Sequence, residues 1–382
     1  MSTTAPEANY VMGIPGVWSS ELQLSWSQFH NKSTTMPSLD CDRSAIFRVV
    51  AYHCQDYDAS VLSTSTDTKP PACLIDHGLS TLGDLEVLAV ELFSEILQYA
   101  PLSSVLTFRL LNKRARAAVD TSVPYKYILL NAPCIISALV RTGVSSHFTV
   151  DHIFRTFTTP DCQVCGKFGA FLWIPECIRC CIPCVRESPE LCPMTECDAK
   201  AAFGLTKKTL ASVPVMISLP GTYTLSETPQ KRTRRLLSQK LARLAAVVAH
   251  GGEKGFMDFI DSGISQSRIA YERRVAARNR AQESFDSQGN LNYSIDDVRR
   301  FMATTHLPYF DLTTRTTQNG LSCQGCQLAL EAGSEQTLSS IESYVLLSRR
   351  NLTYTMDGLL EHFKECVEAQ GIWALHRDIL AN

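Results

Sequence analysis

The sequence lacks a secretory signal pattern and any apolar run long enough to cross a membrane. Residues 1–10 carry no basic segment, and no apolar segment follows them. The longest apolar stretch, residues 129–140, is interrupted by Asn131 and Pro133 and falls short of the roughly 20 residues that a span needs. We therefore expect a soluble intracellular protein, in the cytoplasm or the nucleus, that has no membrane partner.

Excess charge and catalytic motifs are also missing. The 36 basic and 38 acidic side chains leave a net charge of −2, which gives the whole chain no pull toward nucleic acid. Glycine-rich nucleotide loops, Gly-x-Ser-x-Gly and His-Glu-x-x-His do not occur. The nine histidines are scattered, and His147 and His152 are predicted to be surface residues rather than general bases. The chain is therefore predicted not to be an enzyme.

The 382 residues suffice for two or three domains of roughly 100–200 residues each. Residues 1–80 are rich in Ser, Thr, Pro and Asp, and we predict a largely disordered tail, although residues 45–53 offer a short local element as an alternative. Changes in composition divide the rest into four regions: 82–128, 129–210, 211–320 and 321–382.

Residues 82–128 carry the strongest helical pattern. Apolar residues recur there at spacings of three and four and so share one predicted helical face: Leu85, Leu88, Leu92, Phe93, Ile96 and Leu97. Ala100-Pro101 ends this helix, and proline suits the first turn of the next. Asn112 is a predicted N-cap for a third short helix over residues 113–119. Three short helices are therefore predicted.

The order of residues in this region resembles the F-box. That family opens with Leu-Pro-x-Glu-Leu, continues with an Ile-Leu pair and a leucine-rich helix, and ends with Arg-x-x-Asn-(Arg/Lys)-x-x-Arg. The matching residues here are Leu88-Ala89-Val90-Glu91-Leu92, Ile96-Leu97, and Arg109, Asn112, Lys113 and Arg116. Ala89 stands where the family usually has proline, and this departure is expected to weaken partner binding without abolishing it.

The resemblance implies a Skp-type adaptor as partner, itself bound to a cullin scaffold. A segment this short cannot bury all of its leucines, so one apolar face is left for a partner helix. The alternative is a helical cap packed on the protein's own core. The residues implied to bind the partner are Leu85, Leu88, Glu91, Leu92, Ile96, Leu97, Val105, Phe108 and Leu111.

Cysteine is abundant, with 15 residues, and eight of them fall between Cys162 and Cys197. In a reducing compartment such clustering indicates metal rather than disulfides. Two Cys-x2-Cys turns can hold one zinc ion, and Gly166 suits the left-handed turn of such a knuckle. The favoured zinc ligands are Cys162, Cys165, Cys181 and Cys184, with Cys177 and Cys180 as alternates. Adding Cys192 and Cys197 gives a second possibility, a two-zinc RING-like or MYND-like module.

The run Cys-x-x-Cys-Gly-x-Phe-Gly-x-Phe-Leu-x-x-Pro-x-Cys-x-Arg-Cys-Cys-x-x-Cys, from Cys162 to Cys184, is similar to a segment that follows the F-box in a group of filamentous-fungal F-box proteins. Both features occur here in that order. The resemblance implies an architecture, an F-box followed by a zinc-binding segment, but no particular substrate.

A second zinc site is predicted at the C-terminus. Cys323-x2-Cys326 has knuckle spacing, and His362-x3-Cys366 lies in a helical pattern that places both ligands on one face. Two ligands from a knuckle and two from a helix complete a tetrahedron. The long gap between the two pairs predicts a structural clasp rather than a base-reading finger.

Residues 231–280 hold 12 basic side chains against four acidic ones, including Arg234, Arg235, Arg273 and Arg274. This excess is open to two interpretations: a solvated helix face, which we favour, or a nucleic-acid surface.

The sequence thus predicts a mainly α fold, with a three-helix F-box-like unit ahead of helices and small zinc-stabilised α+β modules. The expected function is recruitment of an unknown protein substrate to a cullin ubiquitin ligase. Alternatives are a zinc-dependent nucleic-acid-binding regulator and an interaction scaffold outside a ligase.

Overall fold

The computed structural model describes residues 43–54, 56–57, 61–62, 80–223, 229–262, 266–282, 298–334 and 339–381. The chain forms two compact units. Within the described residues, the terminal unit contains residues 43–53, 321–350 and 357–381, and the central unit contains residues 54–320 and 351–356. Helices dominate both units, so the predicted mainly α fold is confirmed.

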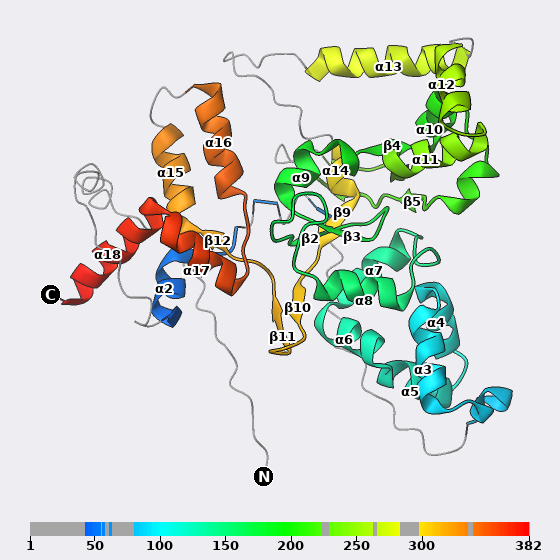
Figure 1. The fold of residues 1–382 in the computed structure, drawn as a ribbon, viewed down its shortest axis with the longest axis horizontal. Helices are drawn as coiled ribbons and strands as arrows, with labels where there is room; N and C mark the ends of the chain where they lie inside the picture. The colour runs from blue at the N-terminus through cyan, green and yellow to red at the C-terminus, as the bar shows by residue number, and fades with distance from the viewer. Residues whose placement is uncertain are drawn as a thin grey trace. The chain divides into compact units, whose positions relative to one another are not determined.

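The central unit begins with a run of short helices (Figure 1). These are the 3-10 helix η1 (Gly83–Val87), α3 (Val90–Tyr99), α4 (Leu102–Arg109), α5 (Lys113–Thr121), α6 (Val123–Asn131), α7 (Pro133–Arg141) and α8 (Val150–Thr158). Helix α3 ends at Ala100, which is extended because Pro101 follows it. The predicted N-cap at Asn112 is confirmed, since its side chain accepts a 2.8 Å hydrogen bond from the N–H of Ala115.

The single helical face predicted from Leu85 to Leu97 is interrupted in the structure. The 3-10 helix η1 ends at Val87, the N–H of Leu88 donates to the carbonyl of Leu85, and Ala89 is extended before α3 begins. The break allows Leu82 and Leu88 to pack against the core of the unit. Spacing alone did not reveal this break because Ala89 is compatible with a helix.

A small sheet organises the cysteine-rich segment. Strands β2 (Phe171–Trp173) and β3 (Ile178–Cys180) form an antiparallel hairpin, and β9 (Thr304–His306) pairs with the other edge of β2. Helix α9 (Ile182–Glu187) follows β3 directly. This hairpin therefore connects Cys162 and Cys165 to Cys181 and Cys184. Trp173 in β2 is fully buried in the large hydrophobic core of the central unit.

The rest of the central unit packs partly on the large core that contains Trp173 and partly on a second, smaller core. Its elements are η2 (Pro189–Leu191), β4 (Pro193–Thr195), α10 (Glu196–Phe203), η3 (Thr209–Ser212), β5 (Met216–Ile217), β6 (Gly221–Thr222), β7 (Pro229–Gln230), β8 (Arg235–Ser238), α11 (Gln239–Ala249), α12 (Glu253–Asp261), α13 (Gln266–Gln282), α14 (Val298–Met302), β10 (Tyr309–Asp311) and β11 (Thr316–Gln318). Helices α11 and α12 flank His250-Gly251-Gly252. Leu236 and Leu237 lie in β8, the central strand between β4 and β5, and both are completely buried.

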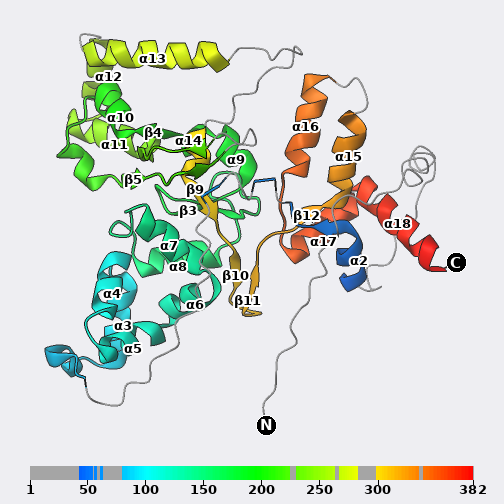
Figure 2. The ribbon, with the colours of Figure 1, turned by 180° about the vertical axis from the view of Figure 1, so that it is seen from behind.

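The terminal unit contains α2 (Arg43–Val50), β1 (Ala51–Tyr52), β12 (Ser322–Cys323), α15 (Gln324–Ser334), α16 (Ser340–Arg350), α17 (Met356–Glu365) and α18 (Val367–Ala381). Helices α15 and α16 lie side by side in both views of the molecule (Figures 1 and 2). Strand β1 pairs antiparallel with β12, which places Ala51 opposite Cys323.

At residues 43–52 the structure shows the short local element that was the alternative to a disordered tail, so the prediction of disorder is wrong there. This segment forms α2 and β1 because β12 supplies a strand partner and because Ile46 and Val50 are buried. Those partners lie about 270 positions away in the chain, so local composition could not reveal them. Residues 1–42 and 63–79 of the predicted tail lie outside the described residues.

In the described part of the chain, no single helix has the length and apolarity of a membrane span. Helices α6 and α7 meet these criteria only together, and they are bent by 94° at their junction.

Candidate metal centres and an exposed apolar helix face

Four cysteines converge in the central unit. The sulfur atoms of Cys162, Cys165, Cys181 and Cys184 all lie within 4.8 Å of one another. The Sγ atoms of Cys165 and Cys181 are 3.6 Å apart. A tetrahedral metal ion with bonds of ~2.3 Å places its sulfur ligands about 3.8 Å apart, so the cluster has the size of a metal site.

Local backbone geometry positions these sulfurs. After Cys162, the chain turns so that the N–H of Gly166 donates to the carbonyl of Cys162 at 2.9 Å, and Gly166 has a φ of +72°. That left-handed conformation favours glycine, as expected for a knuckle. On the other side, Cys181 is the N-cap of α9 and Cys184 lies in its first turn. One loop and one helix start thus supply two ligands each.

The four thiols share hydrogen bonds in a way that suits a cation. Hydrogen bonds from Cys181 and Cys184 lower the pKa of the Cys162 thiol. The pKa of Cys181 is raised, because its hydrogen bond to Cys162 and its burial both favour its protonated form. Thiols this close cannot all ionise together unless a positive charge lies between them. The donor set therefore can hold a soft divalent metal ion.

The alternate ligands Cys177 and Cys180 do not reach this cluster. The carbonyl of Cys177 accepts hydrogen bonds from Thr156 (3.0 Å) and His152 (3.1 Å), which tie it to α8. The thiol of Cys180 donates to the carbonyl of Phe171 at 3.6 Å. Both cysteines are fully buried, and burial raises the pKa of each thiol. They are part of the core rather than of a metal site.

The two-zinc alternative is not what the structure shows. Cys192 and Cys197 are described, yet neither belongs to either cluster of metal-binding side chains found in the described residues. Cys197 lies exposed on α10. A cross-braced module needs eight ligands in two sets, and within the described residues the central unit supplies one set of four.

Arg179 connects the cysteine-rich segment to the rest of the central unit. This residue is part of the Cys-x-Arg-Cys-Cys run, but spacing and composition predicted no role for it. Its guanidinium is 1% exposed and donates hydrogen bonds to five backbone carbonyls: Thr156, Phe157, Gly169, Leu307 and Pro308. Burial lowers the pKa of Arg179 to about 9, so it stays charged at neutral pH. Arg179 thereby ties α8, the first knuckle and the segment after β9 together.

The second cluster lies in the terminal unit. The ligand atoms of Cys323, Cys326, His362 and Cys366 all lie within 4.8 Å of one another. Cys326 Sγ is 3.3 Å from His362 Nε2 and 4.0 Å from Cys366 Sγ, and Cys323 Sγ is 3.8 Å from Cys366 Sγ. These distances fit tetrahedral coordination with bonds of ~2.3 Å to sulfur and ~2.1 Å to nitrogen.

Both halves of this cluster come from helix ends. Cys323 ends β12 and Cys326 lies in the first turn of α15, while His362 lies in α17 and Cys366 follows its last residue. The N–H of Cys366 donates to the carbonyl of His362 at 2.9 Å, which keeps the two ligands one turn apart. Hydrogen bonds from Cys326 and Cys366 lower the pKa of Cys323 to about 3.

Gly325 has a role that only the structure reveals. A Cβ atom at this position would lie 2.4 Å from the backbone nitrogen of Ala369, the third residue of α18. Glycine therefore lets the start of α15 approach the start of α18 closely, and this approach brings Cys326 to Cys366. A glycine between two predicted metal ligands was the available sequence signal.

An apolar face is exposed on the helices of residues 82–121. Leu92 and Ile96 on α3 are 54% and 53% exposed, and Leu110 and Leu111 after α4 are 77% and 66% exposed. Glu91 is exposed, Leu85 is 41% exposed, and Leu88 and Phe108 are half-buried. Leu97 and Val105, which were predicted to bind the partner, are instead only 6% and 1% exposed, because they pack into the core of the central unit.

Sequence reasoning also missed apolar residues on this surface. Val87, Val90 and Leu110 are more than 70% exposed.

The turn that carries Leu110 and Leu111 is held by a buried ion pair between Arg109 and Asp120, with contacts of 2.6 and 3.0 Å. Arg109 is the first arginine of the motif, so this residue fixes the end of α4 rather than facing solvent.

Five of the ten basic residues of 231–280 whose side chains are described form ion pairs with carboxylates. Ion pairs join Arg235 to Glu196, Lys240 to Glu190, Arg243 to Glu253, Arg268 to Glu272, and Arg274 to Asp198. The side chains of Arg278 and Arg280 lie outside the described residues. Pairing reduces the positive field that attracts phosphates. The interpretation as a solvated face rather than a nucleic-acid surface stays a prediction.

A scan against protein-family models, a search of curated proteins and a search of solved structures each found no significant match to this chain.

Proposed function

We propose that this protein is an F-box-type adaptor that recruits protein substrates to a cullin ubiquitin ligase. The observation that carries the proposal is the exposed apolar face formed by Leu92, Ile96, Leu110 and Leu111 on a well-packed helical unit. Water-exposed apolar faces of this kind mark protein interaction sites. The order of motif residues around it resembles the family that docks a Skp-type adaptor through such helices.

The packing behind this face supports a preformed docking surface. Phe93 and Leu97 point from α3 into the core, and Phe93 packs against Phe108 with ring centroids 5.6 Å apart. Leu92 and Ile96, four positions apart, form the adjacent row on α3, turned by about 100° from Phe93 and Leu97. Helix α3 thus presents one apolar side to the protein and another to a partner helix.

We further propose that both clusters bind structural zinc. Structural zinc is usually held by four cysteines, or by three cysteines and one histidine, and both sets occur here with tetrahedral spacing. Neither set leaves a ligand position for a substrate. The ions would stabilise the fold of each unit rather than perform chemistry. In this proposal the protein is non-catalytic, and the ligase partners supply the reaction.

Co-expression of the chain with a Skp-type adaptor and a cullin, followed by purification of the complex, tests the proposed function. The wild-type chain is expected to co-purify with both, and Leu92→Asp with Ile96→Asp is expected to abolish co-purification while zinc content stays unchanged. Val140→Asp, on the exposed side of α7, is the matched control and should bind normally. Retained binding by the double variant would refute the adaptor assignment. Binding to the adaptor without the cullin would instead indicate a scaffold outside a ligase.

A further inference from the structure

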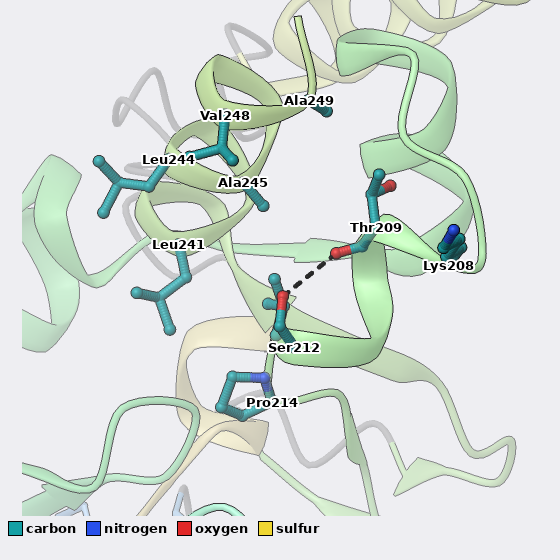
Figure 3. Close-up of a pocket in the computed structure, with 10 residues that line it drawn as sticks. Lys208, Thr209, Ser212, Pro214, Leu241, Leu244, Ala245, Val248 and Ala249 are labelled. Atoms are coloured by element: carbon teal, nitrogen blue, oxygen red, sulfur yellow. Dashed lines mark hydrogen bonds between the residues drawn. The ribbon is translucent and has the colours of Figure 1, made fainter. Parts of the chain in front are cut away.

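A groove of about 390 Å³ opens between η3 and α11 in the central unit. Figure 3 shows Leu241, Leu244, Ala245 and Val248 on α11, which lies beside a segment that carries Thr209, Ser212 and Pro214. The hydroxyl of Ser212 donates to the carbonyl of Thr209 at 3.3 Å, which holds the η3 turn in place. The volume is at the lower end of the roughly 300–1,000 Å³ of ligand clefts.

Helix α11 is apolar on two sides, and its own core uses one. Ala242 and Ala246 are completely buried in the smaller core. Leu244 and Val248, four positions apart, are 51% and 81% exposed, and Leu241 continues the same row. A helix that needs one apolar face to pack does not require a second exposed one. The second face therefore is available to a partner.

Among the described residues, the lysines at the rim of the groove differ from the neighbouring cations in having no carboxylate partner. The neighbouring cations Lys240 and Arg243 are paired with Glu190 and Glu253. Lys208 lines the groove and Lys207 precedes it, and among the described residues neither has a carboxylate partner. An apolar floor beside two unpaired ammonium groups is complementary to an apolar segment with an acidic residue next to it.

We propose that this groove binds a short peptide segment of the recruited protein, with at least two apolar side chains on the floor and an Asp or Glu against Lys207 and Lys208. The inference rests on the proposed function, since it names the chemical class of the segment that the adaptor recognises. The apolar side chains provide burial, and the acidic residue sets the register of the segment along α11.

Selection of random phage-displayed peptides on the full-length chain tests the inference. Enriched peptides are expected to combine neighbouring apolar residues with an acidic residue. A synthetic enriched peptide, followed by fluorescence anisotropy, should lose at least about tenfold in affinity for Leu244→Glu and for Val248→Glu. Met257→Glu, an exposed apolar position on α12, is the matched control and should bind like the wild type.

Reversing the charges of the two lysines distinguishes the contribution of the rim to peptide binding from that of the apolar floor. Lys207→Glu with Lys208→Glu should weaken the acidic peptide and strengthen a version of it in which Lys replaces the acidic residue. No enrichment on the wild-type chain, or undiminished binding by Leu244→Glu and Val248→Glu, would overturn the inference. The same variants should still bind the Skp-type adaptor, so a wild-type chain that binds peptide but no adaptor would refute the proposed function and leave the groove intact.

Discussion

The Sγ atom of Cys326 lies 3.3 Å from the Nε2 atom of His362, although 36 positions separate the two residues in the chain. With Cys323 and Cys366, this contact closes the end of α17 onto the start of α15. A metal ion at this point would contribute directly to the stability of the terminal unit, because such a site does not exist in the unfolded chain.

Replacement of His362 by alanine is expected to lower the metal content from two ions per chain to one. Three thiols that remain cannot complete the tetrahedron, and the terminal unit should unfold at a lower temperature. Elemental analysis of protein purified under reducing conditions measures the content. His147→Ala, an exposed histidine of the central unit, should retain both ions. A His362→Ala protein with two bound ions would contradict the proposed metal site of the terminal unit.

Cys165→Ser and Cys177→Ala should differ in their effect on the metal content of the protein. The first removes a ligand of the central cluster and should lose one ion, whereas the second removes a thiol held in the core and should keep both. The core variant should lose stability modestly, because a small cavity replaces the sulfur. Metal analysis with thermal unfolding distinguishes the two. Loss of an ion in Cys177→Ala would show that the ligand set is wrongly assigned.

Gly325→Ala is expected to destabilise the terminal unit by roughly 1–3 kcal/mol, the usual effect of overpacking. The added methyl group meets the backbone of Ala369, which cannot rotate away as a side chain can. Gly166→Ala provides a contrast, since its Cβ has open space and only the left-handed φ of +72° opposes it, at about 1–2 kcal/mol. Faster metal loss to a chelator is expected for Gly325→Ala at the terminal cluster. Equal chelation rates in wild type and Gly325→Ala would exclude this role.

Arg179→Met should destabilise the central unit by more than about 3 kcal/mol. The substitution leaves several buried carbonyls without a donor, and each such group costs about 1–3 kcal/mol. Arg155, whose side chain is 71% exposed in its ion pair with Asp151 on α8, serves as the control, and Arg155→Met should cost under about 1 kcal/mol. Denaturant unfolding of both variants checks the difference. Similar midpoints for the two variants would disprove the connecting role of Arg179.

Local features of this chain were predictable because they depend on neighbours in sequence. Asn112 caps α5, Pro101 ends α3, and Gly166 provides the left-handed turn after Cys165. The two favoured sets of metal-binding side chains follow the same logic. A Cys-x2-Cys turn or a His-x3-Cys helix turn places two ligands together whatever the rest of the fold does.

Other features were decided by contacts between distant segments. Pairing with β12 makes β1 a strand, and β9 reaches the cysteine-rich hairpin from about 130 positions away. Packing against other helices buries Leu97 and leaves Leu92 exposed, and hydrogen bonds from Thr156 and His152 hold Cys177 away from the four clustered sulfurs. Spacing along a chain gives the order of chemical groups, whereas burial and long-range pairing depend on which surfaces meet, and only the tertiary structure decides that.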